Sequence, residues 1–415
     1  MTTDRLSPLS PALAALAIAL LLGLQPVTTD LYLPALPLLR AQLGASMPAV
    51  QLTMSLLLLA FGAGQLVAGP LSDRFGRRPV LLGGLVLHVA ASLACAAAPH
   101  IEALIVARTV QGLGLAACVV CARAMVRDLY EPAQGAHVMT WAMSGLGVMA
   151  LVAPLAGGWL AARIGWRAPL GGVAAVAGVA LVVIAWRVPE TLGRRDADAL
   201  RLRPLVRTLG QVLRHRTFRA WAGLVSATYG GLFLMLAGSS FVYMGVLGLD
   251  AAGYGVALAS ASLAYLGGTF WCRRLLRRHG LAGAVRRGAA CTLAGGLGMA
   301  ALGLAGSTQL LPVLAAHWLY NIGHGVHQPC GQAGAVGPFP RTAGLASALA
   351  GCVLAAVAFG VGLWLGQALD GTLQPLGLGL GFWAVVTALI AWTWVRRDGE
   401  RFGPAAAGAA APAAR

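Results

Sequence analysis

The stretch Gly69-Pro-Leu-Ser-Asp-Arg-Phe-Gly-Arg-Arg-Pro79 places four charged side chains between two long apolar segments, 50–71 and 80–98. Gly69 and Gly76 allow the backbone to turn sharply, and the charges favour water. A helix needs about 20 apolar residues to cross the hydrocarbon layer of a membrane. This pattern therefore predicts two membrane-spanning helices joined by a short polar loop.

The same apolar pattern recurs along the whole chain. Apolar residues make up 58% of the sequence and charged residues only 10%, with a mean hydropathy of +0.77. Soluble domains carry about 25% charged residues. The first apolar segment is too long for a signal-peptide core, so we expect it to be retained. We predict an all-α membrane protein with twelve spans, at 12–38, 50–71, 80–98, 103–123, 136–160, 168–186, 219–243, 253–272, 288–305, 310–330, 343–365 and 376–395.

An Arg-rich stretch divides the spans into six and six. The loop after the second span has a weak counterpart after the eighth, where Gly268 is followed by four Arg and Gly280. Two six-helix halves are the layout of many transporters, with the substrate site at their interface. The predicted parts are an N-terminal bundle (1–187), a cytoplasmic linker (188–218), a C-terminal bundle (219–397) and a disordered cytoplasmic tail (398–415). Within the linker, Leu200 to Leu213 could form an amphipathic helix lying on anionic lipid.

The basic residues give the orientation. All 30 are Arg and the net charge is +17, a value that nucleic-acid-binding proteins also reach. With the N-terminus inside, however, the outer loops hold only Arg40, Arg163 and Arg167. Cytoplasmic loops of membrane proteins carry this excess of basic residues. We therefore expect both termini in the cytoplasm and no nucleic-acid partner.

The sequence offers little for enzyme, cofactor or metal chemistry. Cys118-Val-Val-Cys121 has redox-motif spacing but falls inside a predicted span, where Cys packs as a small apolar residue. No nucleophile–base pair, phosphate loop or metal-ligand spacing stands out. We expect no enzyme activity, no cofactor and no metal.

One acid and one Arg lie deep within predicted spans, where charge is costly and usually functional. Asp30 is the only acid in such a position, close to the helix-interrupting Pro34 and Pro37, and Arg108 is the only Arg. Counted at 1.5 Å per residue from the outer ends of antiparallel spans, both reach a similar depth. We predict that they form a pair, permanently or in one state, with a role in proton coupling or substrate binding. The alternative is a purely structural ion pair.

The tenth span carries a polar stripe. At 100° per residue, His317, Asn321, His324 and Gln328 fall on one face, and His327 is displaced to the side by about 80°. This stripe should face the central cavity or another helix rather than lipid. Cavity lining, hydrogen bonding between helices and metal binding all remain open, although no carboxylate or thiolate partner is evident nearby.

Several motifs resemble those of the major facilitator superfamily. The loop 69–79, Arg108-Thr-Val-Gln-Gly-Leu-Gly114 and Ala153-Pro-Leu-Ala-Gly-Gly158 resemble the loop, span-4 and span-5 motifs of its proton-coupled drug exporters. Together with 30–37, Val188-Pro-Glu-Thr-Leu192 and Ala343-Gly-Leu-Ala-Ser-Ala-Leu349, they are similar to the bicyclomycin/chloramphenicol-resistance (Bcr/CflA) branch. The polar stripe departs from that branch, whose tenth span is apolar and rich in small residues at this place.

The resemblance implies a monomeric proton-driven exporter of small amphiphilic drugs, such as phenicols, in a bacterial inner membrane. It implies a gating role for the loop (Gly69, Asp73, Arg74, Gly76, Arg77 and Arg78) and an antiporter role for Pro154, Gly157 and Gly158. A basic anchor and a simple Gly/Pro kink are the alternatives. Tyr32, Gln111 and Tyr229 join the stripe as candidate cavity-lining residues, while Tyr243, Tyr265 and Trp318 are aromatic candidates that could equally anchor at the membrane interface. The competing functions are a metabolite exporter or proton symporter of the same fold, and a non-transporting sensor.

Overall fold

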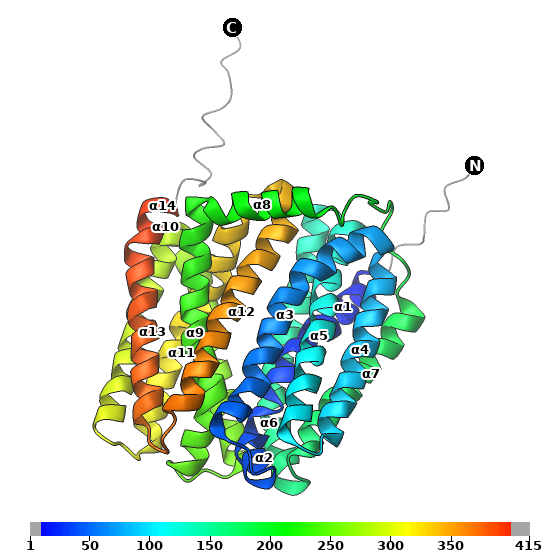
Figure 1. Ribbon diagram of the computed structural model, residues 1–415. Helices are drawn as coiled ribbons and strands as arrows, with labels where there is room; N and C mark the ends of the chain where they lie inside the picture. Colours follow the sequence, from blue (N-terminus) through cyan, green and yellow to red (C-terminus); the bar gives the residue numbers. More distant parts are fainter. Residues whose placement is uncertain (1–9, 400–415) are drawn as a thin grey trace, which may run out of the picture. The chain divides into compact units, whose positions relative to one another are not determined.

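The computed structural model describes residues 10–399, so the predicted tail lies almost wholly outside the described part. Within that part all regular elements are helices (Figure 1). They are α1 (Pro11–Asp30), η1 (Leu33–Ala35), α2 (Leu36–Gln42), α3 (Met47–Phe75), α4 (Arg77–Ala97), α5 (Ile101–Leu129), α6 (Pro132–Arg163), α7 (Arg167–Arg187), α8 (Leu202–Arg214), α9 (Arg216–Gly245), α10 (Ala251–Leu304), α11 (Leu310–Val336), η2 (Pro340–Thr342), α12 (Ala343–Ala368), α13 (Gln374–Trp392) and α14 (Trp394–Asp398).

The helices begin and end where local chemistry requires it. Ser10 and Ser46 cap α1 and α3 through their side-chain oxygens, and each is followed closely by a proline, which suits a first helical turn. Gly76 separates α3 from α4 with φ 110°, a conformation that other residues rarely adopt. The charged loop of the sequence is thus a single-residue break between two long helices.

The chain folds into two compact units. Unit 1 comprises Met1–Leu202 together with Gly248–Ala259, a stretch that includes the first turns of α10. In it α5 packs against both α3 and α4, α1 packs along α6, and α4 packs along α7. These helices run alongside one another in Figure 1. The interior of unit 1 is therefore built around α5, the helix that carries Arg108.

Unit 2 comprises Arg203–Leu247 and Ser260–Arg415. Its central helix is α9, which packs against α11, α12 and α13. Figure 1 shows α9, α11 and α13 side by side. Because α9 contacts the helix that bears the polar stripe, it supplies most of the partners described below.

The twelve-span fold is confirmed. Ten of the described helical segments have the length and apolar character of a membrane span, with α1 to α2, η2 to α12 and α13 to α14 each counted as one. Among them α10 is 54 residues long and breaks at Gly280 (φ 65°, ψ −174°), so it supplies two spans. The remaining span, α11, is outside the ten because its polar stripe lowers its hydropathy.

The linker also contains its predicted helix. It is α8, 13 residues long, which lies across the ends of the unit 2 helices in Figure 1. Val212 is buried, whereas Val206 and Leu213 are exposed.

Candidate functional site

Arg108 lies at the centre of a buried polar cluster in unit 1. Its side chain is fully buried. It donates to the backbone oxygens of Thr28 (3.1 Å) and Thr53 (3.4 Å) and to Oε1 of Gln111 (2.7 Å), and approaches Sδ of Met54 at 3.2 Å. All of these partners are neutral.

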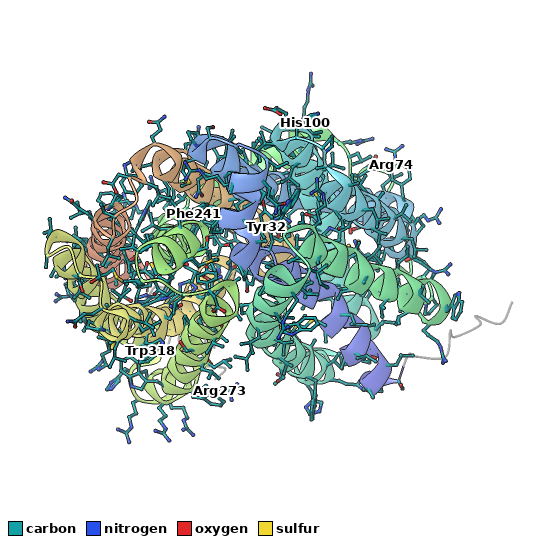
Figure 2. All side chains as sticks on the ribbon, turned by 90° about the horizontal axis from the view of Figure 1, so that it is seen from below. Tyr32, Arg74, His100, Phe241, Arg273 and Trp318 are labelled. Carbon is teal, nitrogen blue, oxygen red and sulfur yellow. The ribbon has the colours of Figure 1, made fainter. Side chains whose placement is uncertain are left out.

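The ring of Tyr32 covers the guanidinium of Arg108, with Cζ 4.5 Å from the ring centroid, a cation–π distance. Tyr32, labelled in Figure 2, is itself fully buried, and its hydroxyl lies 3.1 Å from Oγ1 of Thr53. The cluster thus brings together three predicted site residues: Tyr32, Arg108 and Gln111.

Asp30 is not part of that cluster. It ends α1, is partly exposed, and its carboxylate accepts a hydrogen bond from Oγ1 of Thr29 (2.7 Å). Among the ion pairs of residues 10–399 there is none between Asp30 and Arg108. The predicted direct pair is therefore not formed in this structure. Equal depth does not bring two side chains to the same face: the side chain of Thr28 points to His88 in the cluster, and that of Asp30, two residues on, is rotated by about 200°.

His88 of α4 completes the cluster, and the sequence analysis overlooked it. Its Nε2 lies 3.2 Å from Oγ1 of Thr28 and its Nδ1 lies 3.1 Å from the carbonyl oxygen of Gln111. Nε2 of Gln111 donates to Ser92, whose hydroxyl donates back to the carbonyl of His88. A closed ring of contacts therefore links α1, α4 and α5. The available signal was an ionisable side chain midway along the predicted span 80–98.

The loop between α3 and α4 is tied to two other segments of unit 1. Arg77 pairs with Asp73 and, through Nε, with Asp128 at the end of α5 (2.9 Å). The carboxylate of Glu190 accepts the backbone N–H groups of Arg77 (2.9 Å) and Arg78 (3.2 Å). A carboxylate at the start of α4 satisfies donors that have no partner within the helix.

Two other arginines of that loop donate hydrogen bonds to α7 and to the linker. Arg78 donates to the carbonyl of Ala185 in α7, and Arg74 donates to that of Ala197 in the linker. A Cβ on Gly76 would collide with Glu190, whereas Gly69 faces open space. Of the loop residues, Arg77 and Gly76 are thus the most tightly constrained, and Glu190 and Asp128 are partners that the sequence reading did not assign.

The glycines of the span-5 motif mark close backbone contacts. A Cβ on Gly157 would strike the backbone of Leu31, and one on Gly158 would strike Ala251 at the start of α10. Pro154 lies inside α6, and its carbonyl is the atom that a Cβ on Gly255 would meet. The motif therefore brings α6 against both the end of α1 and the first turn of α10.

In unit 2, the histidines of α11 make hydrogen bonds to neighbouring helices. Nδ1 of His317 lies 3.1 Å from the hydroxyl of Tyr243, and Nδ1 of His324 lies 3.1 Å from Oγ1 of Thr228, both on α9. The ring of Tyr265 lies 5.6 Å from that of His324. Hydrogen bonding between helices, one of the three alternatives, is therefore present.

The other polar residues of the stripe and two of the aromatic candidates lie at buried or half-buried positions. Asn321 is buried and donates to the carbonyl of His317, while Oε1 of Gln328 is buried with no hydrogen-bond partner. Tyr229 is buried on α9, and Trp318, labelled in Figure 2, donates to Ser260. In the described part of the chain no three His, Cys, Asp or Glu side chains gather as metal ligands.

His327, which the helical wheel placed off the stripe, joins the same network. Its Nε2 lies 3.1 Å from the carbonyl oxygen of Val285, and its Nδ1 lies 3.5 Å from Thr228 and 3.4 Å from Thr292. A helical wheel gives the face on which a residue lies but not which helices pack against that face. The position of His327 beside the stripe therefore did not predict these partners.

Comparison with known proteins agrees with this architecture. The family model for the Major Facilitator Superfamily matches residues 18–363. The chain is 31% identical to the chloramphenicol resistance protein of Pseudomonas aeruginosa over 78% of this chain and 76% of that one. It is 32% identical to multidrug resistance protein D of Escherichia coli over 81% and 84%, and 29% identical to a bicyclomycin resistance protein homolog of Haemophilus influenzae over 58% and 60%.

Solved structures of low identity share the fold. A bacterial homolog of the human lysosomal transporter Spinster superposes with a TM-score of 0.72 at 15% identity, covering 95% of this chain and 99% of that chain. A D-xylose–proton symporter gives 0.70 at 17% identity, covering 92% and 97%. The resemblance drawn from the motifs is confirmed, as is the expectation of a transporter rather than an enzyme: the chain is a multi-pass membrane protein that belongs to the major facilitator superfamily.

Proposed function

We propose that the protein exports small amphiphilic antibiotics, with phenicol-like compounds the first to test, in exchange for protons by alternating access. The observation that carries the proposal is the arrangement around Arg108, a buried cation whose hydrogen-bond partners are all neutral. One of these partners is Thr28, which lies two residues before Asp30, the acid that the sequence places deep in a span. A buried charge without a counter-charge is costly. An acid that gains or loses its proton nearby therefore changes the stability of this cluster.

In this mechanism Asp30 binds the proton, and the stability of the Arg108 cluster depends on whether Asp30 is protonated. Thr28 contacts Arg108 and His88, and its neighbour Thr29 donates to Asp30. Protonation of Asp30 removes a negative charge close to α1, and drug and proton compete for this region. The names of the relatives, which refer to chloramphenicol, bicyclomycin and multidrug resistance, support antibiotics as the substrate class.

The proposal also covers the location of the protein, its oligomeric state, its energy source and its gate. The protein resides in a bacterial inner membrane as a monomer with both termini in the cytoplasm, and it needs no cofactor beyond the proton gradient. The loop between α3 and α4 acts as a gate, because Arg77 joins two acids and Glu190 joins it to the linker.

A second candidate, transport of a polar metabolite on the same fold, is favoured by one observation. Buried His317, Asn321 and His324 offer several hydrogen-bonding groups, more than an apolar drug needs. A specific polar substrate would match them.

The test is resistance and transport by Asp30→Asn beside Glu102→Gln, an exposed acid that pairs with His100. At equal expression, we expect Asp30→Asn to abolish both chloramphenicol resistance and pH-driven transport in proteoliposomes, because its side chain cannot exchange a proton. Glu102→Gln should behave as wild type. Unchanged proton-driven transport in Asp30→Asn would disprove the mechanism, and movement of polar metabolites alone would favour the second candidate.

A further inference from the structure

The membrane-spanning part of the second half contains no formally charged side chain. Asp, Glu, Lys and Arg are absent from 220–249, 251–272, 288–340, 342–369 and 371–395. The side chains there that exchange protons near neutral pH are the three histidines of α11. Any proton taken up inside this half therefore binds to His317, His324 or His327.

Two of the three are joined through one hydroxyl. Oγ1 of Thr228 lies 3.1 Å from Nδ1 of His324 and 3.5 Å from Nδ1 of His327. The Val285 carbonyl can only accept, so Nε2 of His327 carries the hydrogen and, in the neutral ring, Nδ1 accepts. The hydroxyl of Thr292 also lies near that nitrogen but donates its hydrogen to the carbonyl of Gly288, so Thr228 is the donor to Nδ1 of His327 and accepts from Nδ1 of His324. His324 is then left with a free lone pair on Nε2.

The surroundings of this pair are neutral. The groups that contact it are Thr228 from α9, together with Tyr265, Thr292 and the backbone carbonyl of Val285 from α10. None is a carboxylate that could balance an imidazolium. Because a bare buried charge is unfavourable, both rings are neutral in the conformation seen here. A proton must therefore enter and leave when water reaches α11, which links its binding to conformational change.

We propose that His324, connected by Thr228 to His327, is a second proton-binding site of the transport cycle. The proposal rests on the proposed proton exchange but adds to Asp30 a site in the other half of the chain. A proton binds Nε2 of His324, the Nδ1 proton of His324 passes to Thr228, and the hydroxyl proton of Thr228 passes to Nδ1 of His327. The pair of histidines gains one proton in this step and releases one proton before the transport cycle is complete. Thr228 is a positioning residue that holds the two rings in register.

The first experiment needs no substrate. Proton uptake by the purified full-length protein between pH 8 and pH 5 is counted with a pH dye in unbuffered solution, for wild type and His324→Gln. Glutamine keeps hydrogen-bonding ability but cannot bind a proton. We expect the variant to take up about one proton fewer, since the imidazole at which the proton enters is removed and His327 no longer receives a proton through Thr228. Equal uptake by two folded proteins, checked by gel filtration and thermal midpoint, would overturn the proposal.

The second experiment measures coupling, with chloramphenicol as the probe. In proteoliposomes without a membrane potential, each exchanged proton multiplies the equilibrium accumulation ratio by about ten per pH unit. We expect about 100-fold per pH unit for wild type and Thr228→Ser, and about tenfold for His324→Gln and Thr228→Val. Thr228→Val has the shape of threonine without its hydroxyl, so a merely structural role would leave this slope unchanged, and an unchanged slope contradicts the proposal. If wild type moves no compound, the proposed function fails, while the uptake experiment still decides the histidine site.

Discussion

Arg108 directs its donors at two backbone carbonyls, one amide oxygen and one sulfur, and its face lies against an aromatic ring. This arrangement depends on the planar, multi-donor shape of a guanidinium, which an ammonium group cannot reproduce. At the residue scale, then, the cluster requires arginine and not simply a positive charge.

We therefore expect Arg108→Lys to reduce pH-driven chloramphenicol transport in proteoliposomes at least about tenfold, because the loss of one hydrogen bond from a charged group costs about 1.5–3 kcal/mol. Arg40→Lys, at an exposed position of α2, is the matched control and should retain wild-type rates. Normal transport by Arg108→Lys would show that charge alone suffices.

At the residue level, the sequence singles out candidate side chains but does not give the direction in which each one points. Asp30, Arg108 and the α11 histidines stand out because ionisable side chains are rare in apolar spans. Which way each one points depends on the neighbouring helix, as with Arg108, which contacts Thr28 instead of Asp30. His88 and His327 gained their places only through partners on other helices.

At the element scale, α6 shows why two adjacent glycines matter. The backbone of Leu31 occupies the place where a Cβ of residue 157 would stand, while Gly171 of α7 has open space around it. Such close approach lets helices pack tightly where lipid provides no hydrophobic driving force between them. Hydropathy predicted these helices well, including the two spans on either side of the break at Gly280 within α10.

Gly157→Ala should consequently lower the thermal midpoint of the purified protein and impair transport, because the clash is with backbone and cannot be relieved by a side-chain rotation. Gly171→Ala should match or exceed wild-type stability, since alanine favours helix over glycine by about 1 kcal/mol. The two variants are compared by thermal unfolding in one detergent. Equal midpoints would mean that α1 and α6 shift apart at little cost.

At the scale of the whole molecule, the Arg distribution predicts which loops lie on which side of the membrane. His100, in the loop before α5, and Asp198, in the linker, are each 62% exposed, so they form a matched pair. We expect a membrane-impermeant maleimide to label His100→Cys on intact cells and Asp198→Cys only after permeabilisation. Wild type, whose seven cysteines are buried or half-buried, gives the background. The reverse pattern would invert the topology and the direction of transport.

The first unit includes the opening turns of α10, Gly248–Ala259, which meet α6 at Gly158. A ribosome making this chain has therefore not supplied all of the first unit when it finishes α7; it must first synthesise α8 and α9, which belong to the second. Because domains fold largely in order of synthesis, Gly158 of α6 lacks its packing partner until α10 emerges. The maturation of the first half is thus tied to the biogenesis of the second, and a chain truncated after the linker lacks the segment that packs on Gly158.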